Sequence, residues 1–347
     1  METIWFCLLW FMFAMYVVLD GFDIGVGVLH LWVARGNAER RQVLRSIGPV
    51  WDGNEVWLLA AGGTLFMAFP AVYATSFSGF YLPLMMVLWL LLGRALGIEL
   101  RHQIDDSMWT QFWDVVFAVS SLLLAVLLGA ALGNVVRGVP IDGTGRFFEP
   151  LWTDFRVGDR TGVLDWYTVL VGLTAATALA HHGALWLAAR TDEAVQARAQ
   201  RAAGALWPVV LVLAVFATVA SFAVQPNIGD SLSARPWGLG FALMSVAGLI
   251  GSLVLRKRGQ ARAAFLASGV FLFALVCCAA LGIYPYLLPA RDPALGMIAH
   301  DHAAGAHGLA VGLAWWLPGM LVVCVYSWLV VYRMLPATFS IHDNETH

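Results

Sequence analysis

Nine long apolar stretches divide the sequence, and they limit the folds open to this chain more than any other feature does. A transmembrane helix needs roughly 20 mostly apolar residues. Stretches of this kind lie at 5–33, 51–69, 78–100, 113–136, 164–189, 206–224, 237–255, 263–283 and 309–332. None of them alternates between apolar and polar residues as a half-buried strand does. The sequence therefore predicts an all-α integral membrane protein of about nine transmembrane helices, forming a single polytopic domain over residues 1–347.

The content of charged residues supports a membrane location. Only 12% of the residues are charged, whereas a soluble domain carries about a quarter, so most of the surface is expected to face lipid. The net charge of −2 gives no sign of a nucleic-acid partner. The first apolar stretch continues too far for a signal peptide, and we expect it to be a retained first helix.

The distribution of basic residues predicts the orientation, because cytoplasmic connections carry an excess of Lys and Arg. Fourteen lie in or beside the odd-numbered connections and the C-terminal segment: Arg35, Arg40, Arg41, Arg45, Arg94, Arg101, Arg190, Arg198, Arg201, Arg256, Lys257, Arg258, Arg262 and Arg333. The other six are Arg137, Arg146, Arg156, Arg160, Arg235 and Arg291. We therefore expect a multi-pass protein with its N-terminus outside and its C-terminus in the cytoplasm.

Ionisable side chains occur inside the first three stretches, where they are costly and usually functional. They are Asp20 and Asp23 in the first, Asp52 and Glu55 at the start of the second, and Arg94, Glu99 and Arg101 at the end of the third. The two acids of each pair are three residues apart and so share a helical face. The predicted orientation places all of these groups in the cytoplasmic leaflet.

Two interpretations of this charge cluster are open. In one, ion pairs hold three helices together and Asp52 caps the second helix. In the other, the acids line a polar cavity through which protons enter from the cytoplasm. The two overlap, because an ion-pair network can also conduct protons. Gly21 and Gly25 interleave with Asp20 and Asp23, which indicates that this part of the first helix is buried in protein.

The histidines give little support for a haem or metal site. His181 and His182 are neighbours and point about 100° apart on a helix, so they cannot both face one iron. We expect polar contacts within the bundle for both. His300, His302 and His307 lie just before the last stretch, where a solvated loop is the simpler interpretation and metal binding the alternative.

Four segments of the first hundred residues resemble the second subunit of cytochrome bd-type oxidases. They are LDGFDIGVG at 19–27, GPVWDGNEVWL at 48–58, the run Ser78-Gly79-Phe80-Tyr81, and the segment from Gly93-Arg94 to Glu99 and Arg101. Their order, spacing and charge placement all fit that family. Beyond them the similarity is mostly one of topology.

The resemblance implies a nine-helix fold of two four-helix bundles plus a peripheral helix. It implies a respiratory quinol:oxygen oxidoreductase in a bacterial or archaeal cell membrane, which reduces O2 to water. The two b-type haems and one d-type haem are expected in a larger partner subunit. This chain would ligate none, would stabilise that partner, and could hold a structural quinone. A small single-helix subunit can also be present.

The resemblance also assigns a proton path to this chain. It makes Asp52 the principal residue, with Asp23 and Arg94 near it, so that Arg94 can hold the Asp52 carboxylate ionised. The full set expected on the path is Asp52, Asp23, Asp20, Glu55, Arg94 and Glu99. Two other classes of protein remain open: a secondary transporter whose acids couple protons or Na⁺ to a substrate, and a membrane scaffold without chemistry of its own.

Overall fold

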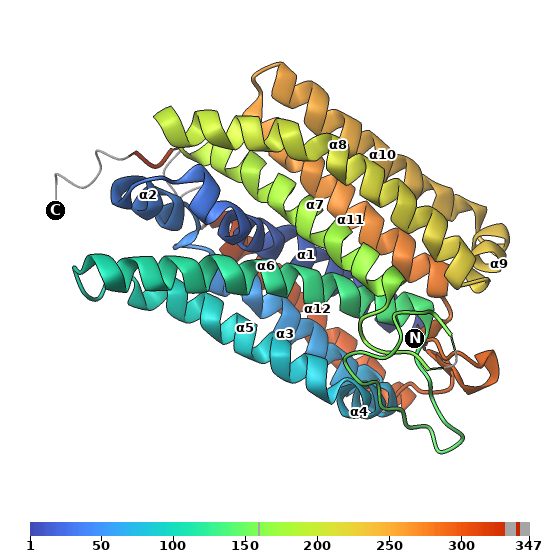
Figure 1. The fold of residues 1–347 in the computed structure, drawn as a ribbon. Coiled ribbons are helices and arrows are strands. Elements are labelled where there is room, and N and C mark those ends of the chain that lie inside the picture. Colours follow the sequence, from blue (N-terminus) through green and yellow to red (C-terminus); the bar gives the residue numbers. More distant parts are fainter. Residues whose placement is uncertain (159, 330–337, 341–347) are drawn as a thin grey trace.

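The computed structural model describes residues 1–158, 160–329 and 338–340. Its long helices lie side by side along one direction (Figure 1). The α-helices are α1 (Glu2–Val33), α2 (Asn37–Ile47), α3 (Trp51–Ala68), α4 (Pro70–Gly79), α5 (Tyr81–Leu100), α6 (Ser107–Arg137), α7 (Trp166–Arg190), α8 (Glu193–Val224), α9 (Asn227–Ala234), α10 (Leu239–Lys257), α11 (Ala261–Ile283) and α12 (Ala306–Trp328). The remaining elements are the 3-10 turns η1 (Pro236–Gly238) and η2 (Pro293–Leu295) and an antiparallel pair, β1 (Tyr286–Leu288) and β2 (Met297–Ile298).

Eight helices in the described part of the chain are long and apolar enough to cross a membrane. They are α1, α5, α6, α7, α8, α10, α11 and α12. The predicted second span is present as α3, but its first turns carry Asp52, Asn54 and Glu55, so it is less apolar than the others. It nevertheless packs against α1 within the bundle. Whether α3 completes a ninth crossing stays a prediction.

Eight of the long helices form two groups of four, and the first helix, α1, belongs to one group and contacts the other. One group comprises α1, α3, α5 and α6, and the other α7, α8, α10 and α11; α1 contacts both, through α7 and α11. The helix α12 lies outside and packs against α3. A Cβ on Gly25 would lie 1.9 Å from the backbone oxygen of Leu179, so only glycine permits this approach of α1 to α7. The expected pair of four-helix bundles with a peripheral helix is therefore observed.

Several helix boundaries differ from those that hydropathy predicts; α6, for instance, begins at Ser107 rather than near residue 113. The helix α8 begins at Glu193 rather than near residue 206, because its first turns are polar and project beyond the apolar part. There Arg198 Nη2 contacts Glu39 of α2 at 2.5 Å. The short helix α4 lies between the second and third predicted spans, and it begins at Pro70, a residue suited to the first helical position. The predicted end of the last span at residue 332 lies outside the described residues.

The two ends of the bundle differ in what they carry. We call one the arginine-rich end; it comprises α2 and the turns that join α5 to α6, α7 to α8 and α10 to α11 (Figure 1). The opposite end carries α4, α9, the long 138–165 connection and the β1–β2 hairpin. The helix α1 runs toward the arginine-rich end. Basic-residue counting predicts that this end faces the cytoplasm.

Candidate functional site

A buried arginine joins three helices of the first group. Arg94 of α5 donates from Nη1 to Asp20 Oδ1 of α1 at 2.6 Å and from Nη2 to Glu55 Oε2 of α3 at 2.8 Å. The side chains of Arg94 and Asp20 are fully buried, whereas that of Glu55 is 24% exposed. Charge-assisted hydrogen bonds of this length are strong. The sequence placed these groups in one leaflet, and the structure shows that they touch.

A second link joins α1 to α3 one turn away. Asn54 Nδ2 donates to Asp23 Oδ2 at 2.7 Å, and the Asp23 side chain is fully buried. The other carboxylate oxygens, Oδ1 of Asp23 and Oδ2 of Asp20, have no hydrogen-bonding partner within the described part of the chain. These buried atoms are therefore acceptors that no described residue uses.

The balance of charge in this group of residues favours an exchangeable proton. Two of the carboxylates, those of Asp20 and Glu55, share the guanidinium of Arg94, whereas the nearby Asp23 carboxylate is bonded only by the neutral Asn54 amide among the described residues. Away from water, unbalanced negative charge is unfavourable. A bound proton relieves the imbalance, and its departure restores it. The arrangement can thus hold the helices together and also carry a proton, so it fits both interpretations of the cluster.

Two of the predicted residues lie apart from Arg94. Asp52 is exposed in the first turn of α3 and makes no hydrogen bond or ion pair with the described residues. The helix has no side-chain cap, so the interpretation of Asp52 as an N-cap is wrong. Arg94 pairs with Asp20 and Glu55, and the expected Arg94–Asp52 pairing is also wrong. Glu99 is exposed and lines a cavity of about 530 Å³ beside Arg41, one helical turn beyond Arg94.

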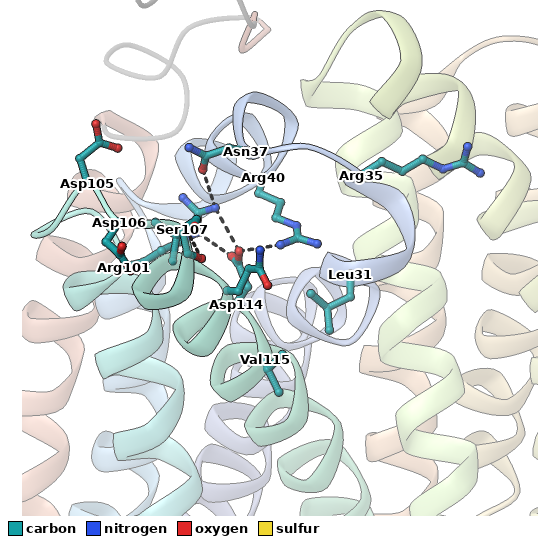
Figure 2. A pocket seen from close by; sticks show the side chains of 12 residues that line it. Leu31, Arg35, Asn37, Arg40, Arg101, Asp105, Asp106, Ser107, Asp114 and Val115 are labelled. Carbon is teal, nitrogen blue, oxygen red and sulfur yellow. Dashed lines mark hydrogen bonds and ion pairs between the residues drawn. The ribbon is translucent and has the colours of Figure 1, made fainter.

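A cluster that we did not predict lies nearer the arginine-rich end, and Figure 2 shows its members Asn37, Arg40, Arg101 and Asp114. Asp114 of α6, almost fully buried, accepts from Arg101 Nε at 2.5 Å and from Arg40 Nη1 at 2.9 Å. His30 Nε2 of α1 lies 2.6 Å from the same carboxylate. Arg101 also donates to Asn37 at 2.9 Å. The carboxylate thereby ties together α1, the start of α2, the end of α5 and the start of α6.

This cluster lines a cavity of about 570 Å³ (Figure 2). Asp114, Arg40 and Arg101 all border it. The sequence held a signal for the site, since Asp114 is an acid inside an apolar stretch, which is the criterion that identified Asp20 and Asp23. His30 lies seven residues after Asp23 and so on the same face of α1.

The histidines of α7 contact the bundle as expected. His181 Nδ1 lies 3.1 Å from Ala203 O and its Nε2 3.3 Å from Ser252 Oγ. His182 Nδ1 lies 2.6 Å from Ser268 Oγ and its Nε2 3.1 Å from Val18 O. Neither ring has a nitrogen left for an iron, so these residues do not fit a haem-ligand role.

The loop histidines do not converge on one point. His302 Nδ1 lies 3.0 Å from the backbone oxygen of Ile298, and exposed His300 lies 3.8 Å from the Glu2 carboxylate. Among the described residues there is no group of three or more His, Cys, Asp or Glu side chains placed to hold a metal ion.

A separate buried cluster anchors the long connection at the opposite end. Arg137, fully buried at the end of α6, pairs with Asp165 and with Glu149. Glu149 also accepts from Thr161 Oγ1 at 2.8 Å. Burial raises the pKa of the Glu149 carboxyl despite the neighbouring guanidinium. From the sequence Arg137 counts only as a charge on the outside, whereas in the structure it fastens a loop to the bundle.

An apolar groove of about 450 Å³ runs along α7, α8, α10 and α11. Leu211, Val215 and Phe271 are among its apolar lining, and Tyr167, Ser221 and Arg235 are among its polar residues. Tyr167 Oη and Ser221 Oγ lie 2.8 Å apart. The groove is long and apolar with few polar groups, as expected of a site for a lipid-like chain.

Comparison with known proteins gives consistent matches along the chain. The sequence model of the family described as "Cytochrome bd terminal oxidase subunit II" matches residues 1–335. The "Probable cytochrome oxidase subunit 2" of Haemophilus influenzae is 30% identical over all of this chain and 98% of its own length. The "Cytochrome bd-I ubiquinol oxidase subunit 2" of Escherichia coli K12 is 30% identical over 83% of this chain and 82% of its own.

Two further matches support the same family and fold. The "Cytochrome bd ubiquinol oxidase subunit 2" of Bacillus subtilis is 36% identical over 66% of this chain and 64% of its own. A chain of the bd oxidase from Geobacillus thermodenitrificans superimposes with a TM-score of 0.75 over 96% of this chain and 98% of that one. At 17% identity, that last likeness concerns the fold alone.

Proposed function

Because this chain belongs to the cytochrome bd terminal oxidase subunit II family, we propose that it is the non-haem subunit of a quinol:oxygen oxidoreductase of the cell membrane. Its partner would be a larger subunit that carries two b-type haems and one d-type haem. Haem chemistry would be supplied entirely there: the α7 histidines do not fit an iron. None of the comparisons points to a transporter.

The proposed contribution of this chain to the reaction is proton uptake. Reduction of O2 to water consumes protons, and a buried haem site receives them only through titratable groups or water. The observation that carries the proposal is the buried Arg94 bonded to Asp20 and Glu55, with Asp23 bonded to Asn54 one turn further along α1. Glu55 is partly exposed and Asp23 is fully buried, so the group offers a proton a carboxylate that water can reach and another that it cannot.

Asp52 keeps a place in this proposal as an outer residue. Its exposed carboxylate lies on α3 two residues before Asn54, whose amide bonds Asp23. It can therefore collect protons at the predicted cytoplasmic mouth, while Glu99 would do so beside the neighbouring cavity. We expect replacement of either outer acid to slow turnover less than replacement of a buried acid. Water can deliver protons directly to the exposed positions, whereas it cannot reach the buried ones.

The partner is expected against the side of the first group where α3 and α5 lie. Val56, Leu59 and Phe66 of α3 are exposed there, and so is Asp52 on the same helix. A subunit covering this face would bury the apolar row and bring the nearby acids close to its haems, while Asp52 at the predicted cytoplasmic mouth would stay open to water. A small single-helix subunit could add to the same assembly.

The groove along α8 and α10 is the proposed site of a structural quinone. Its length and apolar lining suit an isoprenoid tail, and Arg235, Tyr167 and Ser221 offer hydrogen bonds to a ring carbonyl. Such a quinone would stabilise the second group of helices. It would take no part in turnover.

The proposal is tested on the purified two-subunit complex with Asp23→Asn and Asp52→Asn variants. Asn keeps the size and some hydrogen bonding of Asp but cannot carry a proton. We expect both variants to retain full haem spectra and to reduce O2 slowly, with the larger loss for Asp23. A loss of haem from Asp23→Asn would instead support a purely structural role. Full haem with unimpaired turnover in both variants would refute the proton-uptake role.

A further inference from the structure

We propose that His30 and Asp114 form an entrance for protons that feeds the Arg94 group from the cavity in Figure 2. The inference rests on the proton-uptake function proposed above and adds the residues at which protons enter. It concerns a site that lies on different side chains from Asp52 and Glu99.

The location of the pair suits such an entrance. Asp114 borders the cavity, and His30 lies behind it and is fully buried. Arg40, whose side chain is 22% exposed, reaches across to Asp114 from the solvent side. A proton in the cavity therefore meets the carboxylate first and the imidazole next.

The imidazole has a free nitrogen for the transfer. His30 Nε2 contacts Asp114, whereas the buried Nδ1 has no hydrogen-bonding partner in the described part of the chain. In the tautomer that carries its hydrogen on Nδ1, Nε2 can take the proton that the Asp114 carboxyl has received from the cavity. Nδ1 then releases its own proton to the next acceptor, and a flip of the ring restores the starting tautomer. The imidazolium formed between the two steps is paired with Asp114 and opposed by Arg40 and Arg101. That opposition makes the charged state short-lived, as a relay requires.

A line of polar groups leads from His30 to the Arg94 group. His30, Gly27, Asp23 and Asp20 follow one another at spacings of three or four residues and so lie on one face of α1. At 1.5 Å per residue, Gly27 lies about 4.5 Å along the axis from His30, and Asp23 about 6 Å further.

The gap at Gly27 is filled by a hydroxyl. A Cβ on Gly27 would lie 2.0 Å from Ser121 Oγ, so the hydroxyl of this α6 residue sits directly against the glycine. Ser121 Oγ donates to the backbone oxygen of Phe117 at 2.7 Å and keeps its lone pairs free. Beyond it, Asp23 Oδ1 is an acceptor without a partner. The Phe117 ring lies against Gly27 and makes a T-shaped contact with the His30 ring, so the bridging waters that complete the path would lie beside that ring.

Neighbouring serines of α6 provide a matched test in the purified complex. Ser121 faces Gly27 of α1, whereas Ser120 faces Gly93 of α5. Alanine is well accepted in helices, so both Ser121→Ala and Ser120→Ala should fold. His30→Gln is the third variant; it can still donate to Asp114 but cannot relay a proton.

The assay is O2 reduction at saturating quinol over a range of pH, normalised to haem content. At about pH 8 we expect roughly tenfold slower turnover for His30→Gln and Ser121→Ala, with a deficit that shrinks as protons become abundant. Ser120→Ala should stay within about twofold of the unmodified complex. If His30→Gln does not assemble, Ser121→Ala decides the matter.

Two outcomes would overturn the entrance. One is unimpaired turnover of Ser121→Ala at every pH while Asp23→Asn is slow; the other is a loss in His30→Gln that does not depend on pH, which would indicate a structural clamp. If Asp23→Asn itself turns over normally, the proton-uptake function fails as a whole.

Discussion

Removal of the Arg94 charge is the perturbation for which the structure predicts the largest effect. Both terminal nitrogens of Arg94 bind acids, at 2.6 Å and 2.8 Å, and its side chain is fully buried. In Arg94→Met the Asp20 carboxylate would lose the one ion-pair partner that it has among the described residues, while still buried. Breaking a buried pair in this way costs about 3–5 kcal/mol of unfolding free energy.

The double variant Arg94→Met with Asp20→Asn shows where that cost arises. It removes the stranded charge, so we expect it to be more stable than Arg94→Met alone, by about 2 kcal/mol. The exposed Arg41, which lies 3.9 Å from Asp105, provides the control. Arg41→Met should cost at most about 0.5 kcal/mol.

The unfolding free energies can be measured by titrating the complex with a denaturing detergent in mixed micelles, with haem absorbance as a second probe. The reasoning fails if Arg94→Met is no less stable than Arg41→Met. It fails equally if neutralising Asp20 in the Arg94→Met background lowers stability further.

Three other predictions concern the rest of the chain. Arg137→Leu leaves Glu149 and Asp165 buried without their partner and should lower the free energy of unfolding by about 3–5 kcal/mol. Arg146→Leu, in the exposed part of the same connection, should change it by less than about 0.5 kcal/mol. Equal effects would contradict the anchoring role of Arg137. The hydrogen bond from Arg198 holds the pKa of the Glu39 carboxyl below its ordinary value of 4.5, so its stabilising contribution is present above that pH and is lost as the pH falls through the lowered pKa. Glu39→Gln should therefore cost less than about 1 kcal/mol near neutral pH and nothing in acid, and a deficit that persists in acid would rule out the ion pair as its cause. Reporter fusions should place the N-terminus outside and the C-terminus in the cytoplasm; both ends on one side would exclude an odd number of crossings.

The sequence was a good guide to the helices because their positions depend on local composition. Eight of the nine predicted spans are helices long and apolar enough to cross a membrane, within the described residues. The exception, α3, has Asp52 and Glu55 in its first two turns. The predicted start of α8 was wrong, because polar first turns extend the helix beyond the apolar stretch. Backbone hydrogen bonding can continue a helix into water, where hydropathy gives no signal.

The partners of the charged residues could not be predicted in the same way. Which groups touch depends on how each helix is rotated about its axis and how closely neighbours approach. Asp52 and Glu55 are three residues apart on α3, yet Glu55 reaches Arg94 and Asp52 faces outward. Asp114 was not predicted because it is the one acid of its predicted span. Its partners His30, Arg40 and Arg101 lie on other elements, and only the structure shows that they contact it.

The first helix explains why packing and proton chemistry occupy the same place. Its stripe of Asp20, Asp23 and His30 needs partners from α3, α5 and α6, and only close approach supplies them. Glycine at position 27 admits the Ser121 hydroxyl, and glycine at position 25 admits the α7 backbone on another face. The same small residues that let helices pack therefore leave polar groups within reach of one another. A substitution that enlarges Gly27, such as Gly27→Val, should consequently disturb assembly and proton uptake together, whereas Ser121→Ala should separate the two.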